Sequence, residues 1–188
     1  MNKEEVLRYL RTNSKTQDEK ILELVDTAIK EVEKTAQPKT LYRVFGCDVN
    51  GDETVIGGVA FRSKRLAENM AGCKRAVVFG ATLGLGVDRL IKTASATDMA
   101  KAMAYQAAAA TLIEEVCDSL EEDIKKALGV KLRRRYSPGY FDLDVTEQKK
   151  LFSMIDITKR IGITLADSCQ MMPSKSVTAF IGIEENDD

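Results

Sequence analysis

Histidine and tryptophan are both absent from this sequence of 188 residues. Without histidine, the chain cannot build a His-based catalytic triad, a His-ligated zinc site or an imidazole ligand to cobalt or haem iron. Without tryptophan, a stacking platform must come from the five tyrosines or the six phenylalanines. Chemistry that needs an imidazole must therefore be supplied by a partner or by a cofactor.

The chain also has few cysteines, no long apolar run and almost no net charge. The four cysteines, at positions 47, 73, 117 and 169, have no C-x-x-C spacing, and the N-terminus has no secretory pattern, so we expect reduced thiols in a cytoplasmic protein. Apolar runs fall far short of the roughly 18 residues that a membrane span needs. The formal net charge of -1 gives no overall field that would attract nucleic acid or an anionic membrane.

The order of elements predicts a single α+β domain over residues 1–188, with a mainly antiparallel sheet packed with helices. Hydrophobic residues make up 44% of the chain, enough for one core of useful size. Periodicity, turns and caps predict strands over 40–49, 53–61, 75–79, 162–165 and 176–183, and helices over 18–34, 63–70, from about 87, and over about 146–160. The last five residues, EENDD, read as a frayed acidic tail.

The longest predicted helix runs from about 97 to 128. Ser95 and Asp98 resemble a capping box at its start, and Gly129 closes it. A narrow arc holds the expected core face: Met99, Ala102, Met103, Ala110, Ile113, Cys117, Leu120, Ile124 and Leu128. Glu115 lies opposite this arc and should be solvated, whereas Glu114 lies at its margin. There Glu114 suits either a boundary salt bridge or the lining of a cleft.

A glycine-rich loop, GATLGLG over residues 80–86, connects a strand to a helix. Its spacing matches neither G-x-G-x-x-G nor a P-loop, and no lysine follows it. Tight packing of the strand against the helix and contact with a ligand are both open interpretations.

The segment Arg133-Arg134-Arg135-Tyr136-Ser137-Pro138-Gly139-Tyr140 offers the richest recognition chemistry. Pro-Gly predicts a turn, Gly139 allows close approach, and Tyr140 offers an aromatic face. S-adenosylmethionine needs a guanidinium for its carboxylate and a carboxylate or aromatic face for its ammonium and sulfonium. Arg135, the backbone of the turn and Glu114 could meet these needs. Composition alone leaves nucleotide or phosphate recognition equally open, and a solvated charge run is the third interpretation.

Two ordered motifs resemble the activation domain of cobalamin-dependent methionine synthase. Residues 135–140 match the R-x-x-x-G-Y signature of that family. Residues 161–177, IGITLADSCQMMPSKSV, are similar to its I-G-x-x-L-T-E-S-x-x-M-x-P-x-x-S-V. The resemblance is clear over about 97–183, with Phe141 standing where many members have proline.

This resemblance implies a stand-alone, short form of an S-adenosylmethionine-binding reactivation module. Such a module supports reductive methylation of cob(II)alamin carried by a methionine synthase or other corrinoid protein, with a flavodoxin-like protein as candidate electron donor. It implies Arg135 for the ligand carboxylate, Glu114 for the ammonium, and Ser137, Gly139 and Tyr140 around the adenosyl and sulfonium parts. The alternative is a non-catalytic module that docks on a corrinoid methyltransferase or senses S-adenosylmethionine. Neither reading requires a metal ligand or an activated nucleophile from this chain.

Overall fold

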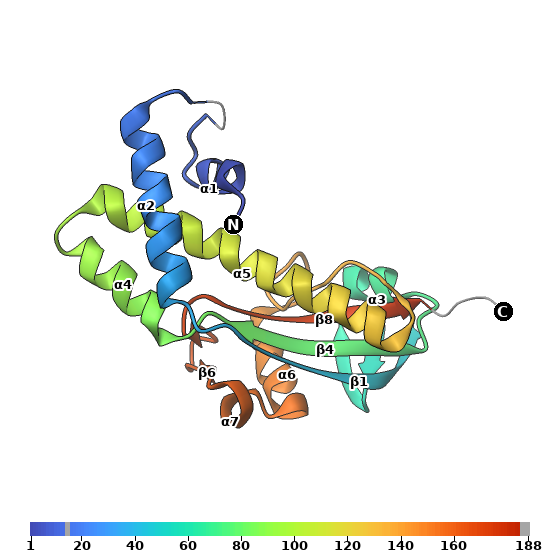
Figure 1. Cartoon of the computed structure of the whole chain (residues 1–188). Helices are drawn as coiled ribbons and strands as arrows, with labels where there is room; N and C mark the ends of the chain where they lie inside the picture. Colours follow the sequence, from blue (N-terminus) through green and yellow to red (C-terminus); the bar gives the residue numbers. More distant parts are fainter. Residues whose placement is uncertain (14–15, 185–188) are drawn as a thin grey trace.

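A six-stranded antiparallel sheet forms the centre of the computed structural model, which describes residues 1–13 and 16–184 (Figure 1). Its spatial order is β3-β2-β1-β4-β8-β5. The strands are β1 (Lys39–Asn50), β2 (Glu53–Ile56), β3 (Val59–Arg62), β4 (Arg75–Thr82), β5 (Lys131–Leu132) and β8 (Ser176–Glu184). A separate ribbon pairs β6 (Thr164–Leu165) with β7 (Met171–Met172). The predicted α+β class and antiparallel pairing are confirmed.

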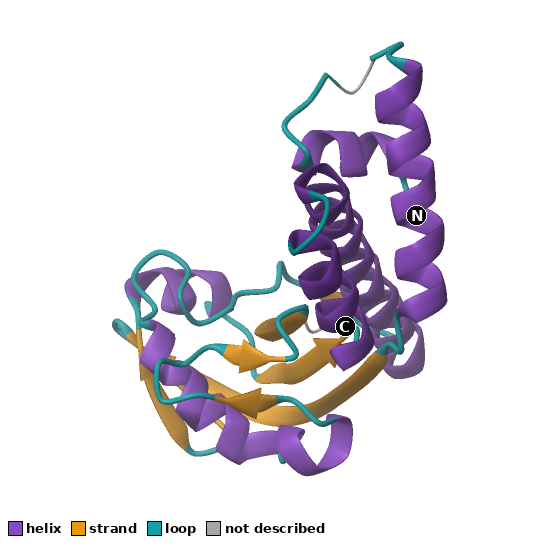
Figure 2. Cartoon of the chain, turned by 90° about the vertical axis from the view of Figure 1, so that its left-hand side faces the viewer, coloured by secondary structure: helices purple, strands orange, loops and turns teal. Residues whose placement is uncertain are grey.

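Helices cover both faces of the sheet and create two hydrophobic cores. One face carries α1 (Lys3–Tyr9), α2 (Glu19–Thr35), α4 (Leu85–Ser95) and α5 (Met99–Leu128). The other carries α3 (Lys64–Met70), α6 (Gln148–Ile155) and α7 (Ile157–Ile161). Figure 1 shows α5 lying along the sheet, with α6 and α7 on the opposite side, and Figure 2 shows the helices of the first face projecting beyond the sheet.

Strand β4 separates the two cores, which explains its continuous apolar sequence. Val77 and Phe79 point into the core under α5, whereas Ala76 and Val78 point into the core under α6 and α7. All four side chains are fully buried. Because side chains alternate between the two faces of a strand, β4 contributes apolar side chains to both cores.

Local capping signals set several of the helix ends. The Ser63 hydroxyl accepts a hydrogen bond from the Leu66 backbone N–H at 3.0 Å and opens α3 as predicted. The predicted capping box at Ser95 is wrong, because Asp98 alone caps α5 by accepting from the Lys101 N–H at 3.0 Å. Ser95 is instead the last residue of α4. Gly129 ends α5 in the left-handed conformation, as predicted.

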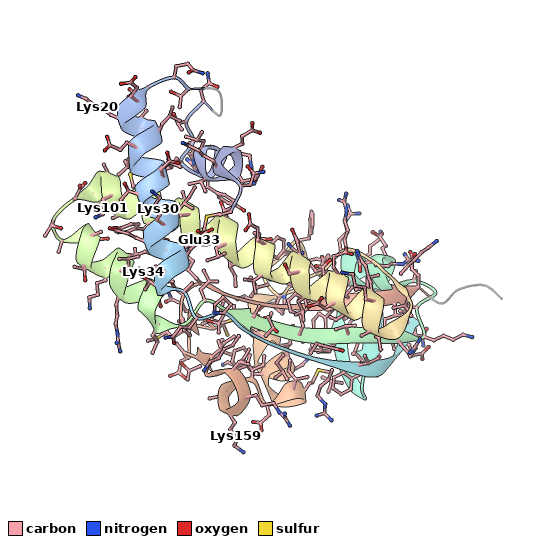
Figure 3. The ribbon with its side chains drawn as sticks, viewed as in Figure 1. Lys20, Lys30, Glu33, Lys34, Lys101 and Lys159 are labelled. Atoms are coloured by element: carbon pink, nitrogen blue, oxygen red, sulfur yellow. The ribbon has the colours of Figure 1, made fainter. Side chains whose placement is uncertain are left out.

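The predicted core face of α5 is wrong at two positions near the start of the helix. Ala102, Ile113, Cys117 and Ile124 are buried as predicted, but Met99 and Met103 are 62% and 54% exposed. The first half of α5 extends beyond the sheet and packs against α1, α2 and α4, so its alanines face these helices instead. In Figure 3, Lys101 lies beside α2, where its Nζ pairs with a Glu31 carboxylate oxygen at 3.3 Å, and Lys159 of α7 lies across the sheet.

Glu115 is accessible to solvent, as expected, with its side chain 40% exposed. The N-terminal helix adds a contact that helical periodicity did not predict: Glu115 accepts a hydrogen bond from the Asn2 backbone N–H at 2.8 Å. Its carboxylate also lies 3.8 Å from the amino group of Met1. Glu115 therefore helps attach α1 to α5.

The glycine loop serves close packing between helices. Gly86 lies in the first turn of α4, where an added Cβ would approach the Thr35 carbonyl oxygen to 3.0 Å. Gly84 precedes the helix with a φ of +81°, a conformation that favours glycine. These contacts support the packing interpretation of the loop.

Two predicted elements are divided in the structure. The run over 53–61 forms two strands, because Gly57 and Gly58, both with positive φ, make a second tight turn. The predicted helix over 146–160 is interrupted at Asp156, whose left-handed backbone separates α6 from α7. Beyond Glu184, the predicted acidic tail lies outside the described residues. Among residues 1–13 and 16–184, no helix is both long and apolar enough to cross a membrane.

Candidate functional site

A cavity of about 370 Å³ lies where the second half of α5, the turn after β5 and the start of β8 meet. Its lining comes from three separated regions of the sequence: Glu114, then Arg135, Tyr136, Ser137, Pro138, Tyr140, Phe141 and Gln148, and finally Met171, Ser176, Val177 and Thr178. Four of the five predicted site residues, Glu114, Arg135, Ser137 and Tyr140, are among them. The volume falls within the range of small-molecule sites.

The segment after β5 reaches the cavity because it continues along β8. The Arg133 N–H donates to the Gly182 carbonyl at 2.9 Å, and Tyr136 and Phe180 exchange backbone hydrogen bonds at 2.8 Å each. This pairing buries the Tyr136 ring and directs Arg135 toward α5. The arginine run is therefore not a uniform solvated patch.

Arg135 forms the electrostatic centre of the site. Its Nη1 donates to Asp118 at 2.7 Å and to Glu121 at 2.5 Å, and its Nη2 donates to Glu114 at 2.5 Å. Burial opposes the charge of Arg135, but the hydrogen bonds to Glu121, Asp118 and Glu114 outweigh it and hold the pKa of the guanidinium above its ordinary value. Three carboxylates around one guanidinium leave this acidic cluster with a net negative charge.

Helical spacing brings the three carboxylates together. Glu114, Asp118 and Glu121 are separated by four and three residues, so they lie along one side of α5. Like charges at these spacings repel, and the guanidinium of Arg135 offsets that repulsion. Beside them, burial raises the pKa of the Cys117 thiol to about 12, so this cysteine is neutral and is no nucleophile at physiological pH.

The Pro-Gly turn places aromatic side chains at the mouth of the cavity. Tyr140 is 62% exposed and Phe141 is 82% exposed. The Tyr140 N–H donates to the Ser137 carbonyl at 3.2 Å. Gly139 does not line the cavity: with φ at +90°, it forms the turn and donates its N–H to the Leu143 carbonyl at 2.8 Å.

Asp142 attaches this turn to helix α3. Its carboxylate accepts from the Ser63 hydroxyl at 2.6 Å and from the Lys64 N–H at 2.8 Å. The hydrogen bond from Ser63 is the main reason that the pKa of Asp142 lies below its ordinary value. Sequence reasoning missed this contact, which spans 79 residues.

Polar residues from α6 and β8 complete the cavity wall and were also missed. Gln148 is buried, and its amide donates to the Thr178 hydroxyl and, at 3.3 Å, to the sulfur of Met171. The Ser176 hydroxyl donates to the Pro173 carbonyl at 2.7 Å. The one available signal was that Met171 and Ser176 belong to the second family-like motif.

These features define an α+β domain with a small-molecule-sized cavity between its long helix and its sheet. The family described as "Vitamin B12 dependent methionine synthase, activation domain" matches residues 66–187, and the chain belongs to this family. The match covers both the long helix and the cavity-forming turn.

A solved structure entitled "Crystal Structure of the MetH Reactivation Domain bound to AdoHcy" shares the fold, with a TM-score of 0.69. It is 18% identical to this chain, and the similarity covers 96% of this chain and 70% of that one. None of the curated proteins compared with this chain matches it. The chain is thus a reactivation-domain family member whose ligand and partner must be inferred from its own residues.

Proposed function

We propose that this protein binds S-adenosylmethionine in the cavity and supports reductive methylation of cob(II)alamin held by a methionine synthase or a related corrinoid protein. The observation that carries the proposal is the placement of Arg135 and Glu114 in one cavity, with Tyr140 at its mouth. The structural neighbour, whose title names bound AdoHcy, supports the same class of ligand.

The cavity residues fit the charges of S-adenosylmethionine. Arg135 would bind the methionyl carboxylate, and Glu114 would bind the ammonium. The net negative charge of the acidic cluster favours a ligand that also carries a sulfonium cation. Backbone groups of Ser137 and the ring of Tyr140 would hold the adenosyl and sulfonium parts, while Gly139 shapes the turn.

The residues of this chain position and shield the ligand and make no covalent bond. The bound ligand would supply a methyl cation, which combines with the partner's Co(II) cobalamin and one electron to give methylcobalamin, leaving S-adenosylhomocysteine. A flavodoxin-like protein is the proposed electron donor. Glu114 and Arg135 would fix the methionyl end, while the exposed residues of the turn, Gly139, Tyr140 and Phe141, would meet the partner and exclude water.

We expect methyl transfer to require both this protein and a corrinoid partner. The assay mixes the protein, S-adenosylmethionine, a one-electron reductant and a cob(II)alamin-loaded methionine synthase fragment that lacks its own activation domain. The methylcobalamin spectrum is then followed. Omission of this protein should abolish the conversion, and the rate should saturate with partner concentration. Glu114→Gln should slow it, because the ammonium loses its charged acceptor.

Glu122→Gln is the matched control, since Glu122 lies on the same helix, pairs with Lys125 at 2.7 Å and does not line the cavity. Its rate should equal that of the unaltered protein. Methylation of free cobalamin at the same rate without a partner would overturn the composite site. Binding of S-adenosylmethionine in calorimetry, with no transfer to any corrinoid partner, would favour the docking or sensing alternative.

A further inference from the structure

Arg135 has more hydrogen-bond donors than its three carboxylate partners use. A guanidinium carries five N–H groups, two on each Nη and one on Nε. Asp118 and Glu121 accept both hydrogens of Nη1, and Glu114 accepts one from Nη2. In the part of the chain that the structure describes, these are the three hydrogen bonds of the guanidinium, so Nε and one hydrogen of Nη2 are not used. Nε and Nη2 lie along one edge of the guanidinium, and once Glu114 releases Nη2 a ligand carboxylate can accept from both nitrogens.

The three carboxylates differ in their accessibility. The Glu121 side chain is 15% exposed, compared with 43% for Glu114 and 66% for Asp118. Glu114 lines the cavity, whereas Asp118 and Glu121 do not. Glu114 can therefore reach a ligand, while Glu121 contacts Arg135 from behind the cavity wall.

We infer that Glu121, assisted by Asp118, is a positioning residue that holds Nη1 so that the Nε–Nη2 edge of Arg135 is presented to the ligand carboxylate. This inference rests on the proposed function, and it gives the three carboxylates around Arg135 different roles. Glu114 exchanges Arg135 for the ligand ammonium when the ligand binds. Glu121 and Asp118 keep the guanidinium in place during that exchange.

The exchange explains why one guanidinium needs three acidic partners. If Glu114 were the sole anchor, its transfer to the ammonium would leave Arg135 free to rotate about its side-chain torsions. The loss of rotamer freedom would then be added to the cost of binding. Asp118 is exposed and screened by solvent, so the less exposed Glu121 is the stronger anchor.

The test compares S-adenosylmethionine with its decarboxylated form, which keeps the sulfonium and ammonium but lacks the carboxylate. In calorimetry, Glu121→Gln should weaken S-adenosylmethionine binding about 10-fold, the loss expected when one charge-assisted contact is misplaced. Binding of the decarboxylated ligand should be unchanged. Glu121→Asp, which keeps the charge on a shorter stem, should recover part of the loss. Glu122→Gln, on the same helix, should alter neither affinity.

Each outcome bears on a different claim. Unchanged S-adenosylmethionine binding in Glu121→Gln would overturn the positioning role, and so would equal weakening of both ligands, which indicates general loss of structure. If Glu121→Gln does not fold in thermal melting, Asp118→Asn gives the same comparison: it must weaken binding of S-adenosylmethionine but not of the decarboxylated ligand, by a smaller factor because Asp118 is the weaker anchor. Failure of the unaltered protein to bind S-adenosylmethionine, or an equal affinity for both ligands, would instead contradict the proposed function.

Discussion

Replacing Arg135 with alanine should weaken S-adenosylmethionine binding by about 10- to 150-fold, because a charge-assisted hydrogen bond to a carboxylate contributes about 1.5–3 kcal/mol. Calorimetry at fixed ionic strength measures this loss directly. The substitution also removes the shared partner of Glu114, Asp118 and Glu121, so part of the cost will appear as lower stability. Chemical denaturation of the free protein separates the two effects.

The neighbouring arginines provide matched controls for Arg135. Arg134 is exposed, and Arg133 pairs with a carboxylate oxygen of Glu184 at 3.2 Å. Neither residue lines the cavity. Arg133→Ala and Arg134→Ala should therefore change ligand affinity much less than Arg135→Ala. Equal losses from all three substitutions would indicate a diffuse basic patch and would contradict the specific site.

The sequence predicted the fold well wherever a local signal was sufficient. The Ser63 hydroxyl and Gly129 mark helix ends through contacts within a few residues, and both predictions are confirmed. The exposed positions of Met99 and Met103 could not be found in this way, because they depend on which neighbours cover the first half of α5. Helical periodicity identifies an apolar arc, but α1, α2 and α4 pack around that half from other directions.

The prediction of the site residues depended more on the family resemblance than on the chemistry of the side chains. The turn after Arg135 offered suitable groups, yet composition left nucleotide or phosphate recognition open. The spacing of Glu114, Asp118 and Glu121 is that of one side of a helix, but the sequence analysis singled out Glu114 alone. That Arg135 would return to that side depends on pairing between the segment after β5 and strand β8. Gln148 enters the cavity through a similar contact between distant segments, so no local pattern could identify it.

Ile113→Asp should reduce the free energy of unfolding by about 3–5 kcal/mol, since it places an unpaired carboxylate in a packed core. Ile113 is 5% exposed and belongs to the core that α5 shares with the sheet. A loss of that size is a large fraction of the roughly 5–15 kcal/mol that stabilises a typical domain. The midpoint of urea denaturation, followed by far-ultraviolet circular dichroism, measures the change.

Met103→Asp is the informative control, because the same carboxylate is introduced into the same helix at a position that the sequence alone assigned to the core. The structure leaves Met103 54% exposed, so the aspartate stays hydrated. The cost should then be below about 1 kcal/mol, mainly from the lower helix propensity of aspartate. A large loss at Met103 with a small loss at Ile113 would mean that α5 is rotated from its position in the structure. Glu114 and Glu121 would rotate with the helix and lose their contacts with Arg135, so the same result would also contradict the proposed site.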